Sequence, residues 1–253
     1  WFDWIICIFL YFFRMFWITG GYHRYFAHKS YKTSRVFQFI IAFMAQTSAQ
    51  KGALWWAAHH RHHHRHSDTP EDPHSMKLYG FWYSHVGWIV GPDYKETDYR
   101  TIGDYAKYPE LVWLNKYYLV PPVILALAVT ALGAWVNGGS VTLMFTHYGM
   151  STLLIGFFLS TVVLYHGTFS INSIMHKFGN QRYESGDESK NSLCLALLTM
   201  GEGWHNNHHY YEVASRQGFF WWEIDITWYI LKLFSWTGLI WDMKEDRKST
   251  RLN

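Results

Sequence analysis

Long apolar runs alternate with polar, histidine-rich segments along this chain of 253 residues. Three of the runs are candidates to cross a membrane, namely Trp1–Ile18, Tyr117–Val136 and Val141–Tyr165. A helix needs about 20 apolar residues to cross a hydrocarbon core of roughly 30 Å. The second and third runs meet that length, and the first meets it if the chain begins inside a longer span. The pattern therefore predicts an all-α integral membrane protein with three visible membrane helices.

Two other apolar segments are interrupted by polar residues and are expected outside the bilayer core. Val36–Ala49 is too short to span and contains Gln46, so we expect a helix that lies at the interface or is covered by protein. Phe219–Leu239 is rich in aromatic residues, but Glu223 and Asp225 interrupt it. Such a pattern is typical of an amphipathic helix at the membrane interface.

The distribution of basic residues predicts the orientation. The loop 137–140 has no Lys or Arg, whereas 20–35, 51–116 and 177–216 hold most of the bases. Basic segments tend to stay in the cytoplasm, so we expect these three segments there. Two crossings in between return the chain to the same side. We expect one domain, 1–245, in which 20–116 and 166–245 form a helical cytosolic cap.

Composition narrows the classes of function. A net charge of +3 is too small to suggest a nucleic-acid partner. The 15 Trp and 18 Tyr residues suit a protein at membrane interfaces. Cys7 and Cys194 provide neither a disulfide framework nor a cysteine zinc site. The chain begins without Met inside an apolar run, and we expect its N-terminus to be truncated. The polar segment 246–253 is expected to be a non-native tail.

Histidines in spaced clusters are the main chemical feature of the chain. Neutral imidazole is the commonest protein ligand for iron, zinc and copper. A lone histidine is more often a solvated side chain, but three clusters together are not explained in that way. Nine imidazoles are too many for one ion and about right for two. The nine candidates are His23, His28, His60, His63, His64, His176, His205, His208 and His209.

The spacing of two clusters is helical. Positions separated by three and four residues share one face of a helix, about 5–6 Å apart. The second cluster, near His60, and the third, near His205, both have this spacing. The register of the second cluster stays open, because His59, His62 and His63 fit equally well. His23 and His28 are five residues apart, after an expected helix end at Gly20-Gly21.

The histidine clusters belong to longer motifs that follow one another along most of the chain. These motifs are Gly21-Tyr-His-Arg-Tyr-Phe-Ala-His28, His60-Arg-His-His-His64, Asp72-Pro-His74, Ser84-His-Val-Gly-Trp88, Asn172-Ser-Ile-Met-His176 and Gly201-Glu-Gly-Trp-His-Asn-Asn-His-His209. In order and spacing they resemble the membrane fatty acyl desaturases, in the branch of stearoyl-CoA desaturase. The resemblance implies a mushroom-shaped fold of four membrane helices under a cytosolic cap that holds two metals, with the fourth helix preceding Trp1.

The resemblance also implies a site. Two non-haem irons would be held by the nine histidines, in the register of His60, His63 and His64, and Asn172 would reach one iron through water. The positions that match the bend of the acyl tunnel are Gln50, Trp56 and Thr168. The remaining histidines would not be ligands. Carboxylates that could orient ligand histidines are Asp68, Asp72, Asp187 and Glu202.

The implied reaction is O2-dependent insertion of a cis double bond, at delta-9, into a saturated fatty acyl chain. The chain departs from the acyl-CoA members of the family, whose Arg-Asp pair is replaced by Ala58 and His59 and whose upstream Asn is replaced by Lys51. Lys51 could still meet a phosphate, so acyl-CoA, acyl-lipid and acyl-carrier protein stay open as substrates. Electrons would come from a ferredoxin or a small cytochrome, because the chain has no flavin or nicotinamide fingerprint. The histidine-rich second cluster and the compact C-terminus resemble bacterial more than animal members, so we expect a bacterial inner membrane.

Three other functions compete with desaturation. A hydroxylase or ketolase would use the same histidine core, although Asp72-Pro-His74 and Asn172 favour a desaturase. A membrane metal transporter or sensor needs polar ligands within the bilayer, where only His147 and His166 lie near the spans. A zinc hydrolase uses three or four ligands, which is fewer than the nine histidines provide.

Overall fold

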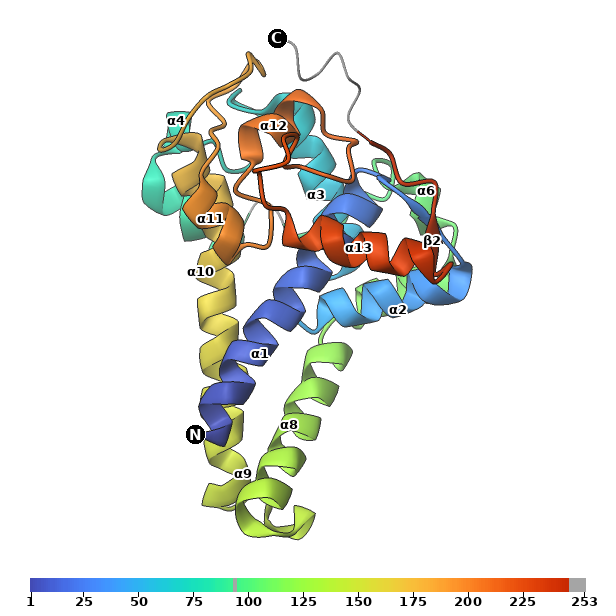
Figure 1. Cartoon of the computed structure of the whole chain (residues 1–253), viewed down its shortest axis with the longest axis vertical. Helices are drawn as coiled ribbons and strands as arrows, with labels where there is room; N and C mark the ends of the chain where they lie inside the picture. The colour runs from blue at the N-terminus through green and yellow to red at the C-terminus, as the bar shows by residue number, and fades with distance from the viewer. Residues whose placement is uncertain (93–94, 246–253) are drawn as a thin grey trace.

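Three helical rods lie below a broader cap in the computed structural model, which describes residues 1–92 and 95–245 (Figure 1). The segment 246–253, predicted to be a non-native tail, lies outside these residues. Each rod is a helix or an unbroken series of helical segments. They are α1 (Phe2–Phe16) with η1 (Trp17–Ala27), α8 (Val120–Gly138), and α9 (His147–Ser151) with η4 (Thr152–Leu159), α10 (Ser160–Ser173) and η5 (Ile174–His176).

The rods are long and apolar enough to cross a membrane, over 2–27, 120–138 and 147–176. They confirm the prediction of an all-α membrane protein with three visible spans. Two predicted ends are wrong. The first helix does not end at Gly20-Gly21, because the backbone continues as the π-helix η1. The third span does not begin at Val141, because η3 (Val141–Leu143) is a separate 3-10 turn.

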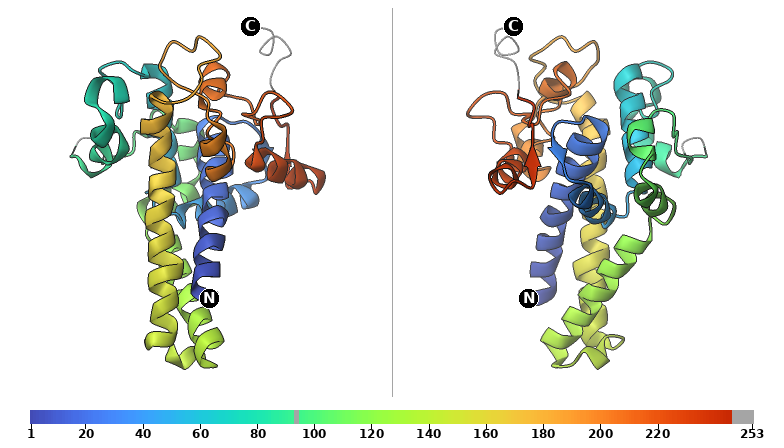
Figure 2. Two further views of the ribbon diagram at one scale, coloured as in Figure 1. Left: turned by 60° about the vertical axis from the view of Figure 1, so that its left-hand side comes forward. Right: turned by 90° about the vertical axis from the view of Figure 1, so that its right-hand side faces the viewer.

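Glycines allow the rods to approach closely. The first rod lies beside η4 and α10 (Figure 2). A Cβ atom on Gly156 would lie 2.8 Å from Ile6 Cγ2, and one on Gly133 would lie 2.0 Å from Thr152 Oγ1. Any larger residue at these two positions would push the helices apart.

The charge that interrupts the first apolar run is buried between helices. Arg14 donates to Thr161 Oγ1 at 2.7 Å and to Ser160 Oγ at 2.6 Å. Its Nε also donates to Leu10 O at 3.0 Å. Charged residues inside membrane spans need such partners, because no water is present to solvate them. Arg14 is therefore compatible with a spanning helix.

The cap is built from short helices around the upper ends of the first and third rods (Figures 1 and 2). Its apolar core packs residues of η1 against α2, α3 and α7. β1 (Lys32–Thr33) and β2 (Ile240–Trp241) pair antiparallel, with Lys32 opposite Trp241. The helices are α2 (Arg35–Gln46), α3 (Ala53–His66), α4 (Met76–Tyr79), η2 (Tyr83–Gly87), α5 (Trp88–Val90), α6 (Gly103–Ala106), α7 (Pro109–Lys116), α11 (Leu193–Leu198), α12 (His205–Tyr210) and α13 (Ile226–Trp236).

Helix α2 lies across the rods, at the base of the cap (Figure 1). Ser34 caps its N-terminus by accepting a hydrogen bond from Phe37 N at 3.2 Å. Its buried face packs on η1, where a Cβ atom on Gly21 would lie 2.8 Å from Ile41 Cγ2. The predicted short helix over Val36–Ala49 is therefore confirmed, and protein covers one of its faces.

The predicted helix Phe219–Leu239 is wrong in extent, because only α13 is helical within it. Asp225 caps α13 by accepting a hydrogen bond from Trp228 N at 3.0 Å. Glu223 is buried and pairs with Arg182. The residues 219–225, up to the N-cap of α13, form turns and are not helical. The helix therefore begins only after the two acids that interrupt the apolar pattern.

Candidate metal centre

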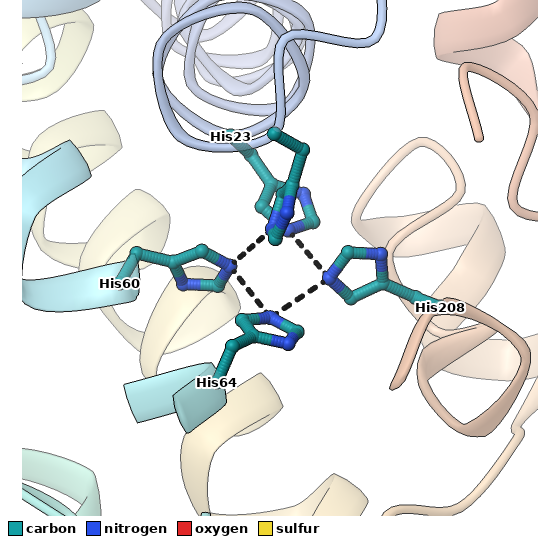
Figure 3. A group of neighbouring side chains, drawn as sticks. His23, His60, His64 and His208 are labelled. Atoms are coloured by element: carbon teal, nitrogen blue, oxygen red, sulfur yellow. Dashed lines mark hydrogen bonds between the residues drawn. The ribbon is translucent and has the colours of Figure 1, made fainter. Parts of the chain in front are cut away.

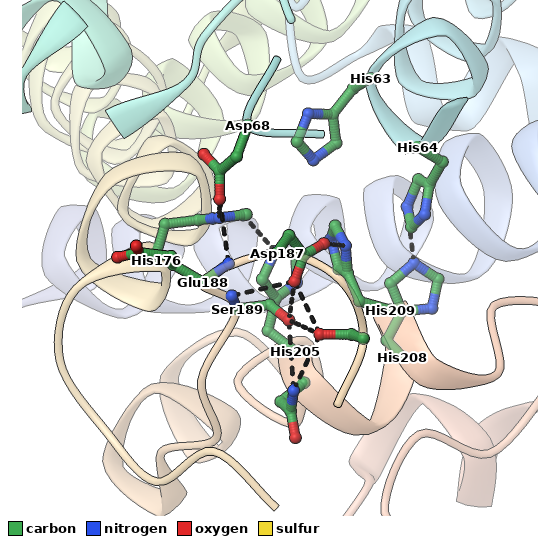
Figure 4. Close-up of polar contacts among 12 residues, drawn as sticks. His63, His64, Asp68, His176, Asp187, Glu188, Ser189, His205, His208 and His209 are labelled. Atoms are coloured by element: carbon green, nitrogen blue, oxygen red, sulfur yellow. Dashed lines mark hydrogen bonds and ion pairs between the residues drawn. The ribbon is translucent and has the colours of Figure 1, made fainter. Parts of the chain in front are cut away.

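Nine histidines converge inside the cap as two neighbouring groups. In the larger group, called group one, one ring nitrogen of each histidine lies within 4.8 Å of a ring nitrogen of every other member. Figure 3 shows four of these rings facing a common centre. In group two the same holds for His63, His176 and His209, and His205 Nε2 lies 3.1 Å from His176 Nε2 (Figure 4). Group one consists of His23, His28, His60, His64 and His208.

A π-helix accounts for the five-residue spacing of the first cluster. Its hydrogen bonds join residues five apart, so these residues are stacked along one side of the helix. His28 N donates to His23 O at 3.1 Å, and the two rings lie 4.8 Å apart. Both therefore face group one without a break in the helix. The expected exit from helix to loop at Gly20-Gly21 is replaced by this wider helical turn.

Two α-helices each supply both groups. On α3, His60 and His64 are four residues apart and point to group one, whereas His63 points to group two. On α12, His208 joins group one and His209 joins group two. The spacing of three and four residues thus serves two adjacent centres, one on either side of the helix face.

The short contacts inside the groups suit a cation at each centre. They join Nε2 to Nε2, as between His23 and His208 at 3.0 Å and between His60 and His28 at 2.9 Å. A neutral imidazole has one proton, and in His23 and His28 a carboxylate beside Nδ1 holds it there, which leaves a lone pair on Nε2. Facing lone pairs repel unless a cation lies between them. Two metal ions therefore fit the donor sets.

Two further ring nitrogens support this fit. Among the residues that the structure describes, His63 Nε2 and His209 Nε2 are buried and have no hydrogen-bond partner. A buried acceptor without a partner costs about 1–3 kcal/mol. Both atoms belong to group two, where a metal would satisfy them.

Carboxylates face the Nδ1 atoms of the histidines. Asp72 Oδ1 lies 2.9 Å from His63 Nδ1, and Glu202 Oε2 lies 2.5 Å from His23 Nδ1. Asp187 contacts His209 Nδ1 in the same way (Figure 4). Asp68 Oδ2 is more distant, 3.7 Å from His176 Nδ1 (Figure 4). All four acids proposed from the sequence thus face a candidate ligand, an arrangement that fixes ring orientation in metal sites.

A fifth carboxylate was missed by the sequence analysis. Glu212 Oε2 lies 3.3 Å from His28 Nδ1 and 3.4 Å from His64 Nδ1. It follows the third histidine cluster by three residues, and this proximity was the available signal. One acid therefore serves two histidines from distant parts of the chain.

Burial favours the neutral form of several imidazoles in the two groups. It lowers the pKa of His60 and of His64 well below the ordinary value. For His209, burial outweighs the opposing effect of Asp187 and lowers the pKa to about 4. Burial alone would raise the pKa of Asp68, but hydrogen bonds from His176 and from the Glu188 N–H lower it to about 2. Neutral imidazoles beside ionised carboxylates are the state that binds metal.

We expect the metal-free protein to lose stability as the pH falls from 7 to 5. The unfolded chain binds protons below the ordinary histidine pKa of 6.5, whereas the buried imidazoles stay neutral. Each such group costs up to about 1.4 kcal/mol per pH unit below that value. Asp68 titrates lower and does not contribute in this range. Thermal unfolding of metal-free protein in detergent at pH 7, 6 and 5 measures the effect, and an unchanged midpoint would contradict it.

The other histidines lie outside the two groups. His62 Nε2 lies 2.9 Å from Glu71 O, on the outer side of α3. His85 Nε2 lies 3.0 Å from His166 Nδ1, below the cap. His74 is the closest of them, because its ring centroid lies 4.2 Å from that of His63. Asp72, His63 and His74 could together approach an ion, but Asp72 already occupies Nδ1 of His63.

An apolar cavity of about 320 Å³ adjoins group one. Gln50 Nε2 donates to Thr168 Oγ1 at 3.0 Å across it. The ring of Trp56 stacks on that of His60, with centroids 4.9 Å apart. All four residues matched to the acyl tunnel and its entrance line this cavity, together with His60 and Asn172. These four are Gln50, Lys51, Trp56 and Thr168.

A second, narrower cavity of about 40 Å³ continues past the histidines. It shares Trp56, Thr168 and Asn172 with the first cavity, and reaches Met15 and Ile171 between the first and third rods. The two cavities are therefore neighbours beside the candidate metal site. Together they can hold an extended apolar chain.

Comparison with known proteins identifies the family. The family model for fatty acid desaturase matches residues 1–237. The chain is 36% identical to an sn-1 stearoyl-lipid 9-desaturase of Anabaena variabilis, over 91% of this chain and 81% of that protein. It is 37% identical to an sn-1 stearoyl-lipid 9-desaturase of Synechocystis, over 90% and 67%. An acyl-CoA 5-desaturase of Anemone leveillei is 32% identical, over 89% and 66%.

Histidine groups fit for two metals, an apolar cavity beside them and three membrane-spanning helices agree with this match. The chain therefore belongs to the fatty acid desaturase family and is a membrane oxidoreductase that desaturates fatty acyl chains.

Proposed function

We propose that this enzyme uses O2 and two irons to introduce a cis double bond at delta-9 of a saturated acyl chain. The observation that supports this most directly is the position of the apolar cavity, whose wall includes His60 of group one. The position of the double bond follows the names of the relatives, several of which are 9-desaturases.

The two histidine groups would each hold one iron. Group one offers five imidazoles, and group two offers four, with Asn172 reaching the metal through water. Bound iron would supply the activation of O2 needed to break an unactivated methylene C–H bond, which no amino-acid side chain can do. The all-imidazole donor set suits iron, and the five imidazoles of group one exceed the three or four protein ligands that one zinc ion uses.

The protein's own residues position the acyl chain and exclude water. Gln50 and Thr168 both line the larger cavity and are joined by a hydrogen bond, and the Trp56 ring stacks on His60, so these side chains restrict the path of the acyl chain. Fixing two neighbouring carbons near the oxidant can be worth several kcal/mol of the barrier. Regioselectivity would thus be determined by the shape of the cavity.

The substrate and setting follow from the relatives and the charges. The curated relatives include enzymes named for stearoyl-lipid, palmitoyl-lipid and acyl-CoA substrates, so we propose an acyl-lipid or acyl-CoA substrate for this chain. Lys51 would meet a phosphate at the cavity mouth. The basic cap would face the cytoplasm of a bacterial inner membrane. A ferredoxin or a small cytochrome would supply electrons.

Expression in a host that lacks its own desaturase tests the function. Gas chromatography with mass spectrometry of derivatised fatty acids should reveal a new cis-monoene, with fragments that place the bond at delta-9. Hydroxy or keto fatty acids would instead indicate the related oxygenase chemistry. Zinc rather than iron in the purified protein, with no product, would contradict the proposal.

We expect Ile171→Phe to shift the product towards shorter chains. Ile171 lines the narrower of the two cavities and not the larger one, so a larger side chain there would shorten the space that continues past the histidines. A difference of one or two methylenes in an apolar pocket is worth about 1–3 kcal/mol, or roughly 10–200-fold. The ratio of C16 to C18 monoenes should therefore rise about tenfold. Val162→Phe, on the exposed side of α10, is the matched control, and an equal shift in both variants would refute the assignment.

A further inference from the structure

One of the five carboxylates behind the histidines differs from the rest in exposure. The side chain of Asp72 is 0% exposed, those of Asp68 and Asp187 are 4% exposed, and that of Glu202 is 9% exposed. The side chain of Glu212 is 49% exposed. The acid behind two histidines of group one is thus in contact with solvent, whereas the side chains of the two histidines themselves are buried.

Glu212 lies in a surface depression of about 250 Å³. His28 and His64 also line this depression. Their Nδ1 atoms face Glu212, while the two Nε2 atoms lie 2.9 and 3.0 Å from His60 Nε2. A single imidazole ring therefore separates the centre of group one from the surface. The depression is separate from the acyl cavity, which lies on the His60 side.

Cations surround the depression. Lys29 and Arg61 pair with Asp104, at 2.6 and 2.8 Å. Arg65 lines the depression, is exposed, and donates to Thr101 Oγ1 at 3.1 Å. Among the described residues, no carboxylate pairs with it.

We propose that this depression is the docking surface for a small acidic one-electron carrier, and that electrons reach group one through the rings of His28 and His64. The proposal rests on the proposed desaturase function. Complementary charge speeds the encounter of such partners, and the rings of His28 and His64, which line the depression, give a short route from the surface to the site. The acyl cavity would be occupied by substrate and so closed to the carrier.

The electron balance requires such a partner. Reduction of O2 to two waters takes four electrons and four protons. The two C–H bonds that are lost supply two of each, and the other two protons come from solvent. The remaining two electrons come from two successive carriers, each oxidised by one electron while the site is reduced by one. No atom passes between carrier and enzyme.

Binding of carrier proteins tests the surface without turnover. The probes are an oxidised plant-type [2Fe–2S] ferredoxin and a small acidic b-type cytochrome, applied to the full chain in nanodiscs by surface plasmon resonance. Arg65→Glu should weaken binding of whichever carrier binds the unmodified chain, about tenfold at low salt and less at high salt. Lys77→Glu on α4, on the other side of the cap (Figure 1), is the matched charge reversal and should leave binding unchanged.

Reduction kinetics separate this proposal from the proposed function. In stopped-flow mixing, Arg65→Glu should slow reduction by the carrier about tenfold, while reduction by neutral photoreduced deazaflavin stays the same. Equal binding by both variants, equal loss in both, or no binding of either carrier by the unmodified chain would overturn the docking surface. Failure of the unmodified chain to hold iron would instead refute the proposed function, and the binding measurement would still test the surface.

Discussion

Replacing His63 by alanine should abolish the monoene and lower the bound iron from about two ions per chain to about one. His63 belongs to group two, and its Nε2 is buried without a hydrogen-bond partner among the described residues. Alanine removes that donor and leaves Asp72 without its histidine. Group two then retains three imidazoles, whereas the five of group one are untouched. Iron analysis of the purified protein and fatty-acid profiles of expressing cells measure the two effects.

The adjacent residue is the control. His62 lies on the same helix but bonds to Glu71 O at 2.9 Å, outside both groups. His62→Ala changes the same number of atoms in α3 and should keep both irons and the product. Retention of two irons in His63→Ala, or equal losses in both variants, would show that the groups are not the ligand sets proposed here.

The order and length of the spans could be predicted from the sequence, because apolar runs of about 20 residues have few alternatives to a membrane helix. The ends could not be predicted as well. Gly20-Gly21 indicates a helix end, yet Gly21 serves the close packing of Ile41, and the helix continues through it. A packing requirement from α2, distant in sequence, decides what the local pattern leaves open.

The histidines themselves were found from spacing, but their division into two groups was not. Spacings of three and four residues place His60, His63 and His64 on one face, and only the position of α12 shows that this face serves two centres. The spacing of five between His23 and His28 requires a π-helix, which local sequence rarely reveals. Glu212 was missed because its one sequence signal, a position three residues after His209, does not indicate the two histidines that it contacts.

Replacing Arg24 by methionine should destabilise the protein by about 3–5 kcal/mol, the second large effect. Arg24 is fully buried and donates to both oxygens of Asp225, at 3.0 and 2.9 Å. It also donates to Oε1 of Glu202 at 3.2 Å, and the other carboxylate oxygen of Glu202 contacts His23. Methionine fills similar space but leaves two buried carboxylates without their cation. The midpoint of thermal unfolding in detergent should fall by roughly 2–4 °C per kcal/mol.

An exposed ion pair of the same geometry is the control. Arg35 donates to both oxygens of Glu110, at 2.6 and 2.8 Å, on the surface of the cap. Exposed pairs contribute little, because solvent screens them in the folded protein. Arg35→Met should therefore leave the unfolding midpoint nearly unchanged. A comparable drop in both variants would show that loss of an arginine side chain, and not burial of its partners, accounts for the effect.

A double variant identifies the buried charge as the cause. Asp225→Asn removes one of the two carboxylates while keeping its side-chain oxygen as an acceptor for Trp228 N, the cap of α13. If unpaired charge is the main cost, Arg24→Met combined with Asp225→Asn should be less destabilised than the sum of the two single variants, by about 0.5–3 kcal/mol. Additive losses would instead mean that Arg24 acts through packing.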